Sequence, residues 1–168
     1  MNFRPFSEND AVFCFKTRSN AFIQKFCGEL SPLEVAACVN AYMPDDYIEM
    51  SREMPVFIVE DNNTPLGFFT LNRLEVNTAE LPLIYFDLDR LRSGIGSACI
   101  KHIESWLAVN WPEVNALVVD TVIPLYNSVF YQKTGFVPLK EIFCEFAGLK
   151  INALRSSKPL INPLLNSA

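Results

Sequence analysis

Residues 83–98 read Leu-Ile-Tyr-Phe-Asp-Leu-Asp-Arg-Leu-Arg-Ser-Gly-Ile-Gly-Ser-Ala. An apolar run that predicts a strand passes into a basic turn with two glycines, and apolar residues at helical spacing follow over 94–109. The start of a helix offers unpaired N–H groups and the positive end of the helix dipole, and glycines let an anion come close to the backbone. Arg90 and Arg92 add positive charge at the same turn. The stretch therefore predicts a strand, a phosphate-binding turn and a helix in succession.

Two other nucleotide-binding motifs fit this turn less well. A Walker loop ends in Gly-Lys-Ser/Thr, whereas Gly96 is followed directly by Ser97. A dinucleotide-binding fingerprint has Gly or Ala at the position that Cys99 occupies. A tight turn with incidental glycines and no ligand is the alternative that this segment alone leaves open.

The remainder of the chain predicts an α/β fold with a mixed sheet and helices on both faces. A helix is expected at 11–26, and a second one follows the Ser31-Pro32-Leu33-Glu34 capping box and ends before a turn-rich break at 43–46. Alternating apolar runs joined by polar turns predict an antiparallel meander, and further strands and one short helix complete the chain. The expected strands are 55–60, 65–74, 79–87, 115–122, 136–146 and 149–154, and the short helix is 124–133.

Composition bounds the class of protein. The chain has 168 residues, 50% of them hydrophobic, and a formal net charge of −5, which argues against a broad nucleic-acid-binding face. Its five cysteines form no close pair, and a single histidine disfavours a His/Cys metal site. The N-terminus is polar, and no segment has the ~18 uninterrupted apolar residues of a membrane span. We therefore expect a cytoplasmic protein with no metal, no membrane segment and no nucleic-acid partner.

A second informative stretch, residues 124–136, reads Pro-Leu-Tyr-Asn-Ser-Val-Phe-Tyr-Gln-Lys-Thr-Gly-Phe. The two stretches together resemble the GNAT superfamily of acyl-CoA-dependent N-acyltransferases. That family has an Arg/Gln-x-x-Gly-x-Gly/Ala loop after its fourth strand and an aromatic-Tyr-x-x-x-Gly-Phe signature on its last helix. Leu91 departs from the first motif, and Pro124 stands where the family often has Asn. The resemblance implies a single domain at 1–155, followed by a tail at 156–168 expected as coil, with a mostly antiparallel sheet splayed between its fourth and fifth strands.

The activity that the resemblance implies is transfer of the acetyl group of acetyl-CoA to a primary amine, by direct attack in a ternary complex. Tyr131 is the expected general acid for the CoA thiolate, with simple packing in an amphipathic helix as the alternative. Asp120 is a weak candidate for the base, beside Asp87 and Glu80. The residues expected to bind the cofactor lie on the fourth strand, in the glycine turn and on the last helix: Phe86, Leu88, Leu91, Arg92, Ser93, Gly94, Ile95, Gly96, Ser97 and Asn127.

The acceptor is expected to be a small-molecule or peptide amine, bound by the N-terminal helices and the loop around 43–47. Asp45 and Asp46 of this loop attract a cation or form a solvated turn. His102, Cys99 and Cys144 are expected to be structural. Two alternatives stay open, a GNAT-fold module that binds CoA without turnover and an α/β domain that binds a partner without a cofactor. The family often dimerises through its C-terminal strands, so the resemblance also allows a homodimer here.

Overall fold

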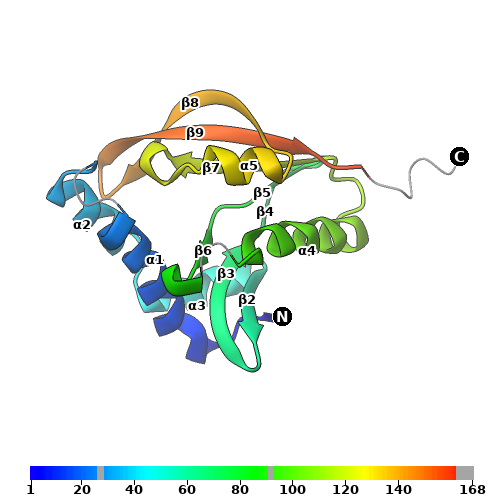
Figure 1. The fold of residues 1–168 in the computed structure, drawn as a ribbon, viewed down its shortest axis with the longest axis horizontal. Coiled ribbons are helices and arrows are strands. Elements are labelled where there is room, and N and C mark those ends of the chain that lie inside the picture. Colours follow the sequence, from blue (N-terminus) through cyan, green and yellow to red (C-terminus); the bar gives the residue numbers. More distant parts are fainter. Residues whose placement is uncertain (26–28, 91–92, 162–168) are drawn as a thin grey trace, which may run out of the picture.

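The computed structural model describes residues 1–25, 29–90 and 93–161, and these form two sheets (Figure 1). The first sheet is antiparallel throughout and has the order β1-β2-β3-β6. The second has the order β4-β5-β7-β9-β8, in which only β5 and β7 run parallel. The strands are β1 (Asn2–Pro5), β2 (Val56–Asp61), β3 (Thr64–Thr70), β4 (Asn72–Glu75), β5 (Thr78–Glu80), β6 (Ile84–Phe86), β7 (Ala116–Val122), β8 (Val137–Phe146) and β9 (Leu149–Pro159).

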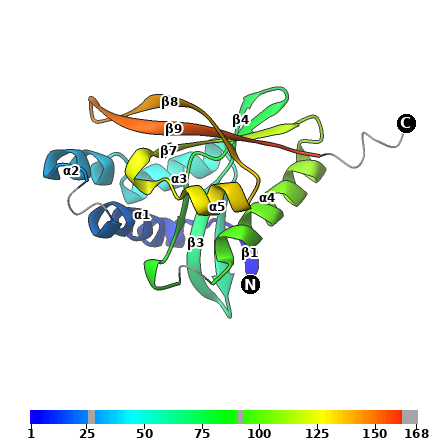
Figure 2. The same ribbon diagram turned by 45° about the horizontal axis from the view of Figure 1, so that its top comes forward.

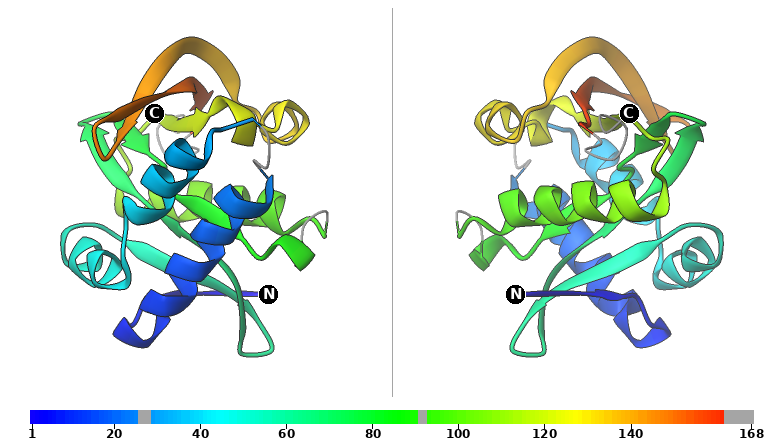
Figure 3. Two further views of the ribbon diagram at one scale, coloured as in Figure 1. Left: turned by 90° about the vertical axis from the view of Figure 1, so that its left-hand side faces the viewer. Right: turned by 90° about the vertical axis from the view of Figure 1, so that its right-hand side faces the viewer.

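Helices cover the sheets from opposite sides. Figure 3 shows α1 and α2 on one side of the molecule and α4 on the other, and Figure 2 places α5 beside the start of α4. The helices are α1 (Ala11–Lys25), α2 (Pro32–Asn40), α3 (Pro44–Glu53), α4 (Ile95–Asn110) and α5 (Ser128–Lys133), with short 3-10 turns at Glu8–Asp10, Leu88–Arg90 and Ile123–Leu125. Within the described ranges, no helix is both long and apolar enough to cross a membrane.

The two sheets separate where the chain passes from β5 to β6. Leu81 N still donates to Val118 O of β7 at 2.8 Å. Two residues later, beyond Pro82, Leu83 O accepts from Thr70 N of β3 at 2.9 Å, so the chain changes its pairing partner across this proline. Beyond it, β6 pairs with β3 and diverges from β7. The mixed α/β fold and the predicted opening before the strand at 116–122 are therefore confirmed.

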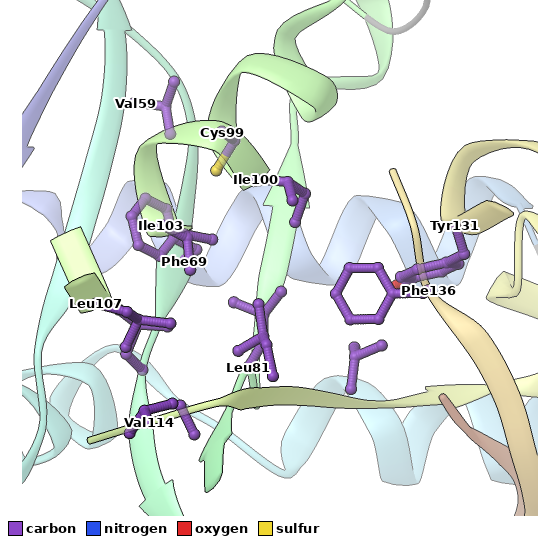
Figure 4. Packing of buried hydrophobic residues seen from close by; sticks show 14 of the residues in the cluster. Val59, Phe69, Leu81, Cys99, Ile100, Ile103, Leu107, Val114, Tyr131 and Phe136 are labelled. Carbon is purple, nitrogen blue, oxygen red and sulfur yellow. The ribbon is translucent and has the colours of Figure 1, made fainter. Parts of the chain in front are cut away.

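The main core cluster fills the space between the sheets and α4. Figure 4 shows side chains of α4 gathered on one side of this cluster and the rings of Tyr131 and Phe136 together on the other. Its members are almost completely buried: Val59, Phe69, Leu71, Ala79, Leu81, Ile95, Cys99, Ile100, Ile103, Leu107, Val114, Leu117, Val119, Tyr131 and Phe136.

An ion-pair network joins β1, β2 and the 3-10 turn that precedes α1. Arg4 Nη1 and Nη2 donate to the two carboxylate oxygens of Asp10 at 2.8 and 2.9 Å, and Arg4 Nε donates to Glu60 Oε2 at 2.8 Å. The Arg4 guanidinium holds the pKa of Asp10 below its ordinary value. This network secures the short edge strand β1, which the sequence did not predict.

Three further expectations are corrected. The predicted break at 43–46 is the start of α3: Pro44 occupies its first turn, and Asp46 Oδ2 accepts from Met43 N at 2.6 Å. The predicted helix from Pro124 begins instead at Ser128, because Pro124 lies in a 3-10 turn and Asn127 caps α5. The coil expected from 156 begins after Pro159, since β9 pairs with β7 up to that residue.

Two smaller differences concern where elements end. The strand expected at 79–87 is divided into β5 and β6 by the interruption at Pro82. The helix expected at 11–26 is described as far as Lys25. Phe26 lies outside the described residues, as do Cys27, Leu91 and Arg92.

Candidate active site

The edge of β6 that faces the opening carries backbone groups without a strand partner among the described residues. Thr70 N donates to Leu83 O at 2.9 Å, and Asp87 N donates to Leu66 O at 2.8 Å, so residues 83, 85 and 87 face β3. Backbone groups alternate in direction along a strand, so the N–H and C=O of Phe86 point toward the opening. Phe86 was a predicted cofactor residue. Leu88, also predicted, lies beyond the strand in a 3-10 turn.

Helix α4 begins shortly after β6 and the 3-10 turn that follows it. Gly94 caps the helix with φ of +83°, a left-handed conformation that favours glycine, and a Cβ there would meet no atom within 4 Å. Ser93 and Gly94 are exposed, and Ala98 N donates to Gly94 O at 3.1 Å. The N–H groups of Ile95, Gly96 and Ser97 precede the first helical hydrogen bonds and are the natural anion donors of this terminus.

Gly96 has a role that the sequence did not reveal. A Cβ at Gly96 would lie 2.6 Å from Phe130 Cε2 and 3.2 Å from Phe130 Cζ. Its missing side chain therefore lets α5 pack against the first turn of α4. Both glycines were predicted to leave open space for an oxyanion. That space is present beside Gly94, whereas the Phe130 ring fills it beside Gly96.

Tyr131 projects from α5 into the core with 6% of its surface exposed. Its ring stacks on Tyr126 with centroids 5.2 Å apart, and Thr121 Oγ1 donates to its hydroxyl at 3.0 Å. Burial raises the pKa of Tyr131 to about 12, and the hydrogen bond with Thr121 opposes that rise. The phenol is therefore protonated at neutral pH.

Asn127 lies one turn before Tyr131. Its Oδ1 accepts from Phe130 N at 3.0 Å, so this oxygen caps α5. The predicted use of Asn127 as a cofactor ligand must therefore rely on the rest of its amide group.

The predicted bases all have hydrogen-bond partners. Arg155, opposite Asp120 across β7 and β9, donates from Nε and Nη2 to its two carboxylate oxygens at 2.7 and 2.6 Å. Glu80 accepts from Asn72 Nδ2 at 3.2 Å. Asp87 Oδ1 accepts from the backbone N–H two residues later, at 3.1 Å. The sequence did not predict the pair of Asp120 and Arg155, because a single sequence does not specify which residues lie opposite each other on neighbouring strands.

Two clefts flank these elements. A cleft of 230 Å³ lies between α1 and the end of β6 and includes Lys16, Asp87 and Asp89 in its lining. A second cleft, of 270 Å³, lies between α4 and α5 and includes Lys101 and Lys133. Polar groups therefore line the surface on both sides of the opening.

The histidine and the described cysteines have structural surroundings. The ring of His102 stacks on Phe3 with centroids 4.0 Å apart, and burial lowers its pKa. Cys99 and Cys144 are free thiols whose pKa is raised by burial, which opposes formation of a nucleophilic thiolate.

Comparison with known proteins supports the arrangement of these elements. The profile of the acetyltransferase (GNAT) family matches residues 20–136. A GCN5-related N-acetyltransferase from Rhodopseudomonas palustris is similar over 95% of both chains, with 18% identity and a TM-score of 0.80. The PaiA N-acetyltransferase of Thermoplasma acidophilum, solved with coenzyme A, has 17% identity and a TM-score of 0.73 over 94% of this chain and 98% of that one.

A third structure is the spermidine N-acetyltransferase of Vibrio cholerae, solved with CoA and spermine. It has 16% identity and a TM-score of 0.67 over 95% of both chains. A search of curated protein sequences finds no match.

Proposed function

Because the chain belongs to the GNAT family of acetyltransferases and is an acyltransferase, we propose that it transfers the acetyl group of acetyl-CoA to a primary amine by direct attack in a ternary complex. The observation that carries this proposal is the opening between β6 and β7, which lies beside the N-terminus of α4. The acceptor is a small-molecule or peptide amine. The cytoplasmic location and the C-terminal homodimer stay predictions.

The described residues fit acetyl-CoA at two places. The outward C=O of Phe86 matches an amide N–H of a pantetheine arm lying along β6, which leaves the outward N–H of Phe86 for the thioester carbonyl. The first turn of α4, at Ile95, Gly96 and Ser97, offers N–H donors and a positive dipole to the pyrophosphate, with open space at Gly94. The lysines of the cleft between α4 and α5 add positive charge nearby.

Bound acetyl-CoA supplies the thioester whose acetyl group is transferred. Phe86 N–H donates to the carbonyl oxygen, where negative charge develops as the amine attacks. Tyr131 Oη gives its proton to the departing sulfur, and the hydrogen bond from Thr121 holds the phenol in place. Asp120 stays the candidate for the base. It is a weak candidate, because Arg155 donates to both of its carboxylate oxygens.

The raised pKa of Tyr131 is compatible with this role. Transfer of its proton, from a pKa of about 12 to a thiolate whose conjugate acid has a pKa of ~8.5, costs about 5 kcal/mol. A turnover of ~1–1,000 s⁻¹ corresponds to a barrier of about 13–17 kcal/mol. The uphill proton transfer is therefore smaller than the barrier of a typical enzyme reaction.

Calorimetric titration with acetyl-CoA, followed by a thiol-release assay over a panel of amines, tests the proposal. Saturable binding and amine-dependent thiol release are expected. Binding without thiol release would favour the GNAT-fold module that binds CoA without turnover, and absence of binding would refute both functions.

Replacement of the proposed acid tests the mechanism. We expect Tyr131→Phe to lower kcat by about 10²–10⁴-fold and to leave the Kd for acetyl-CoA unchanged. Tyr126→Phe is the matched control, since it removes the hydroxyl of the ring stacked on Tyr131, and that hydroxyl is buried without a hydrogen-bond partner. A normal kcat in Tyr131→Phe would exclude this residue as the acid.

A further inference from the structure

Arg18 of α1 is a buried cation that has no carboxylate partner among the described residues. Only 1% of its surface is exposed. Its Nη1 donates to Cys38 O at 2.6 Å, and its Nε is buried without a hydrogen-bond partner. Across residues 1–25, 29–90 and 93–161, it forms no ion pair with a carboxylate. Burying a charge without a counter-ion is unfavourable, so a retained unpaired guanidinium requires an explanation.

Four aromatic rings surround this guanidinium. Its Cζ lies 4.9 Å from the ring centroids of Phe22 and Tyr42, and 5.9 Å from those of Tyr85 and Phe146. Tyr85 belongs to β6 of the first sheet and Phe146 to β8 of the second. Arg18 therefore lies between the two sheets, on the side of the opening covered by α1 and α2.

Tyr47 of α3 adds a second polar group without a partner to the same region. The residue is fully buried, its hydroxyl has no hydrogen-bond partner, and its ring lies 6.2 Å from that of Tyr42. Burial raises the pKa of Tyr47 and the charge of Arg18 opposes the rise, which places the two groups in one electrostatic neighbourhood. Both groups can donate a hydrogen bond, and a carboxylate would accept from both.

A purely structural role explains only part of this arrangement. Cys38 lies in the last turn of α2, so Arg18 stabilises the negative end of that helix dipole. That contact and a side-chain hydrogen bond to the Tyr85 hydroxyl use two of the five N–H groups of the guanidinium, and Nε and Tyr47 Oη are left without a partner.

We propose that Arg18, assisted by Tyr47, binds a carboxylate carried by the acceptor, so that the preferred acceptors are amino-carboxylates such as amino acids. This inference rests on the proposed acetyl transfer. Tyr85, which contacts the guanidinium, immediately precedes Phe86 in β6. An acceptor whose carboxylate lies at Arg18 can therefore extend its amine toward the backbone edge proposed to hold the thioester. Arg18 determines specificity and takes no part in the bond changes.

Matched acceptors test the inference directly. Each common amino acid is compared with the amine formed by its decarboxylation, for example leucine with isoamylamine, in the thiol-release assay. For the preferred pair, we expect kcat/KM to favour the amino acid by about 10- to 150-fold, as for a buried charge-assisted hydrogen bond. If the decarboxylated amines react as well as the amino acids, the inference is wrong while the proposed function stands. If neither kind of acceptor releases thiol, the inference is wrong, and the wider amine panel then decides the proposed function.

Variants of Arg18 separate recognition from folding. Arg18→Met should lose the preference for the carboxylate and keep the Kd for acetyl-CoA, with a Tm at or above that of the parent, because an apolar side chain replaces an unpaired buried charge. Arg18→Lys keeps the charge without the planar fork and should retain part of the preference. Arg52→Met, which removes an exposed cation from α3, is the control and should retain all of it. A full preference in Arg18→Met would overturn the proposal.

Discussion

Replacement of Gly96 by alanine tests whether this glycine serves the packing of α5. The added Cβ would lie 2.6 Å from Phe130 Cε2, a separation that van der Waals repulsion does not allow. The Phe130 ring must therefore move, and it also contacts Tyr131 in a T-shaped pair with centroids 5.0 Å apart. The clash should therefore reach the proposed acid through its neighbour.

The expected loss of stability is moderate. Overpacking costs about 1–3 kcal/mol, and removing a glycine from a helix returns about 0.5–1 kcal/mol. The net fall in the free energy of unfolding is about 0.5–2 kcal/mol, or about 2–4 °C in Tm for each kcal/mol in a chain of this size. In a Phe130→Leu background the clash is absent, so the same Gly96→Ala change should be neutral or stabilising.

Urea unfolding of the parent, both single variants and the double variant measures the coupling. We expect a coupling energy of about 1–3 kcal/mol, as for residues in direct contact. Calorimetry with acetyl-CoA on the same four proteins shows whether any loss of affinity in Gly96→Ala is recovered in the double variant. A Gly96→Ala protein at least as stable as the parent, or additive effects within ~0.3 kcal/mol, would refute the packing argument.

Three other perturbations have definite expected results. Asp120→Asn breaks a partly buried ion pair and should lower the free energy of unfolding by about 1–3 kcal/mol in urea titrations. If the same variant loses the acid limb of the kcat/KM pH profile, Asp120 is the base. Gly94→Ala should cost about 1 kcal/mol through its positive φ and also alter acetyl-CoA affinity, whereas Gly148→Ala, at φ of +79°, should cost stability alone. Arg4 lowers the folded-state pKa of Asp10 below its ordinary 3.8, so the resulting stabilisation is present above pH ~4 and is lost as the pH falls through the folded-state pKa. Arg4→Met should therefore flatten the dependence of the unfolding free energy on pH below ~5. An unchanged dependence would contradict the assignment.

Local signals were sufficient for the elements whose ends are determined by neighbouring residues. The capping box of Ser31 and Glu34 predicted the start of α2, and both of its hydrogen bonds form. The start of α3 was missed because Met43 stands at the cap, although Pro44 and Asp46 supply the other signals. Helix capping was therefore predictable where the capping side chain is a typical one.

Contacts between distant residues account for what the sequence could not predict. Phe130 lies 34 residues after Gly96, so the sequence did not show that its ring fills the space of a Cβ at this glycine. Arg18 was overlooked because a single cation in a helix indicates an exposed face, and the rings around it come from α1, β6, β8 and the turn after α2. Burial and register decide such roles, and neither follows from local spacing.

The divergence of β6 from β7 has a consequence for hydrogen exchange. Along β6, successive amides face β3 and the opening in turn, so protection should alternate from one residue to the next. Tyr85 N–H is paired within the sheet and should exchange slowly, while Phe86 N–H should exchange quickly. An acyl donor bound along this edge would complete the missing half of the ladder, and the alternation would give way to uniform protection. The unpaired edge of β6 would thus hydrogen-bond an extended acyl donor as it would a neighbouring strand.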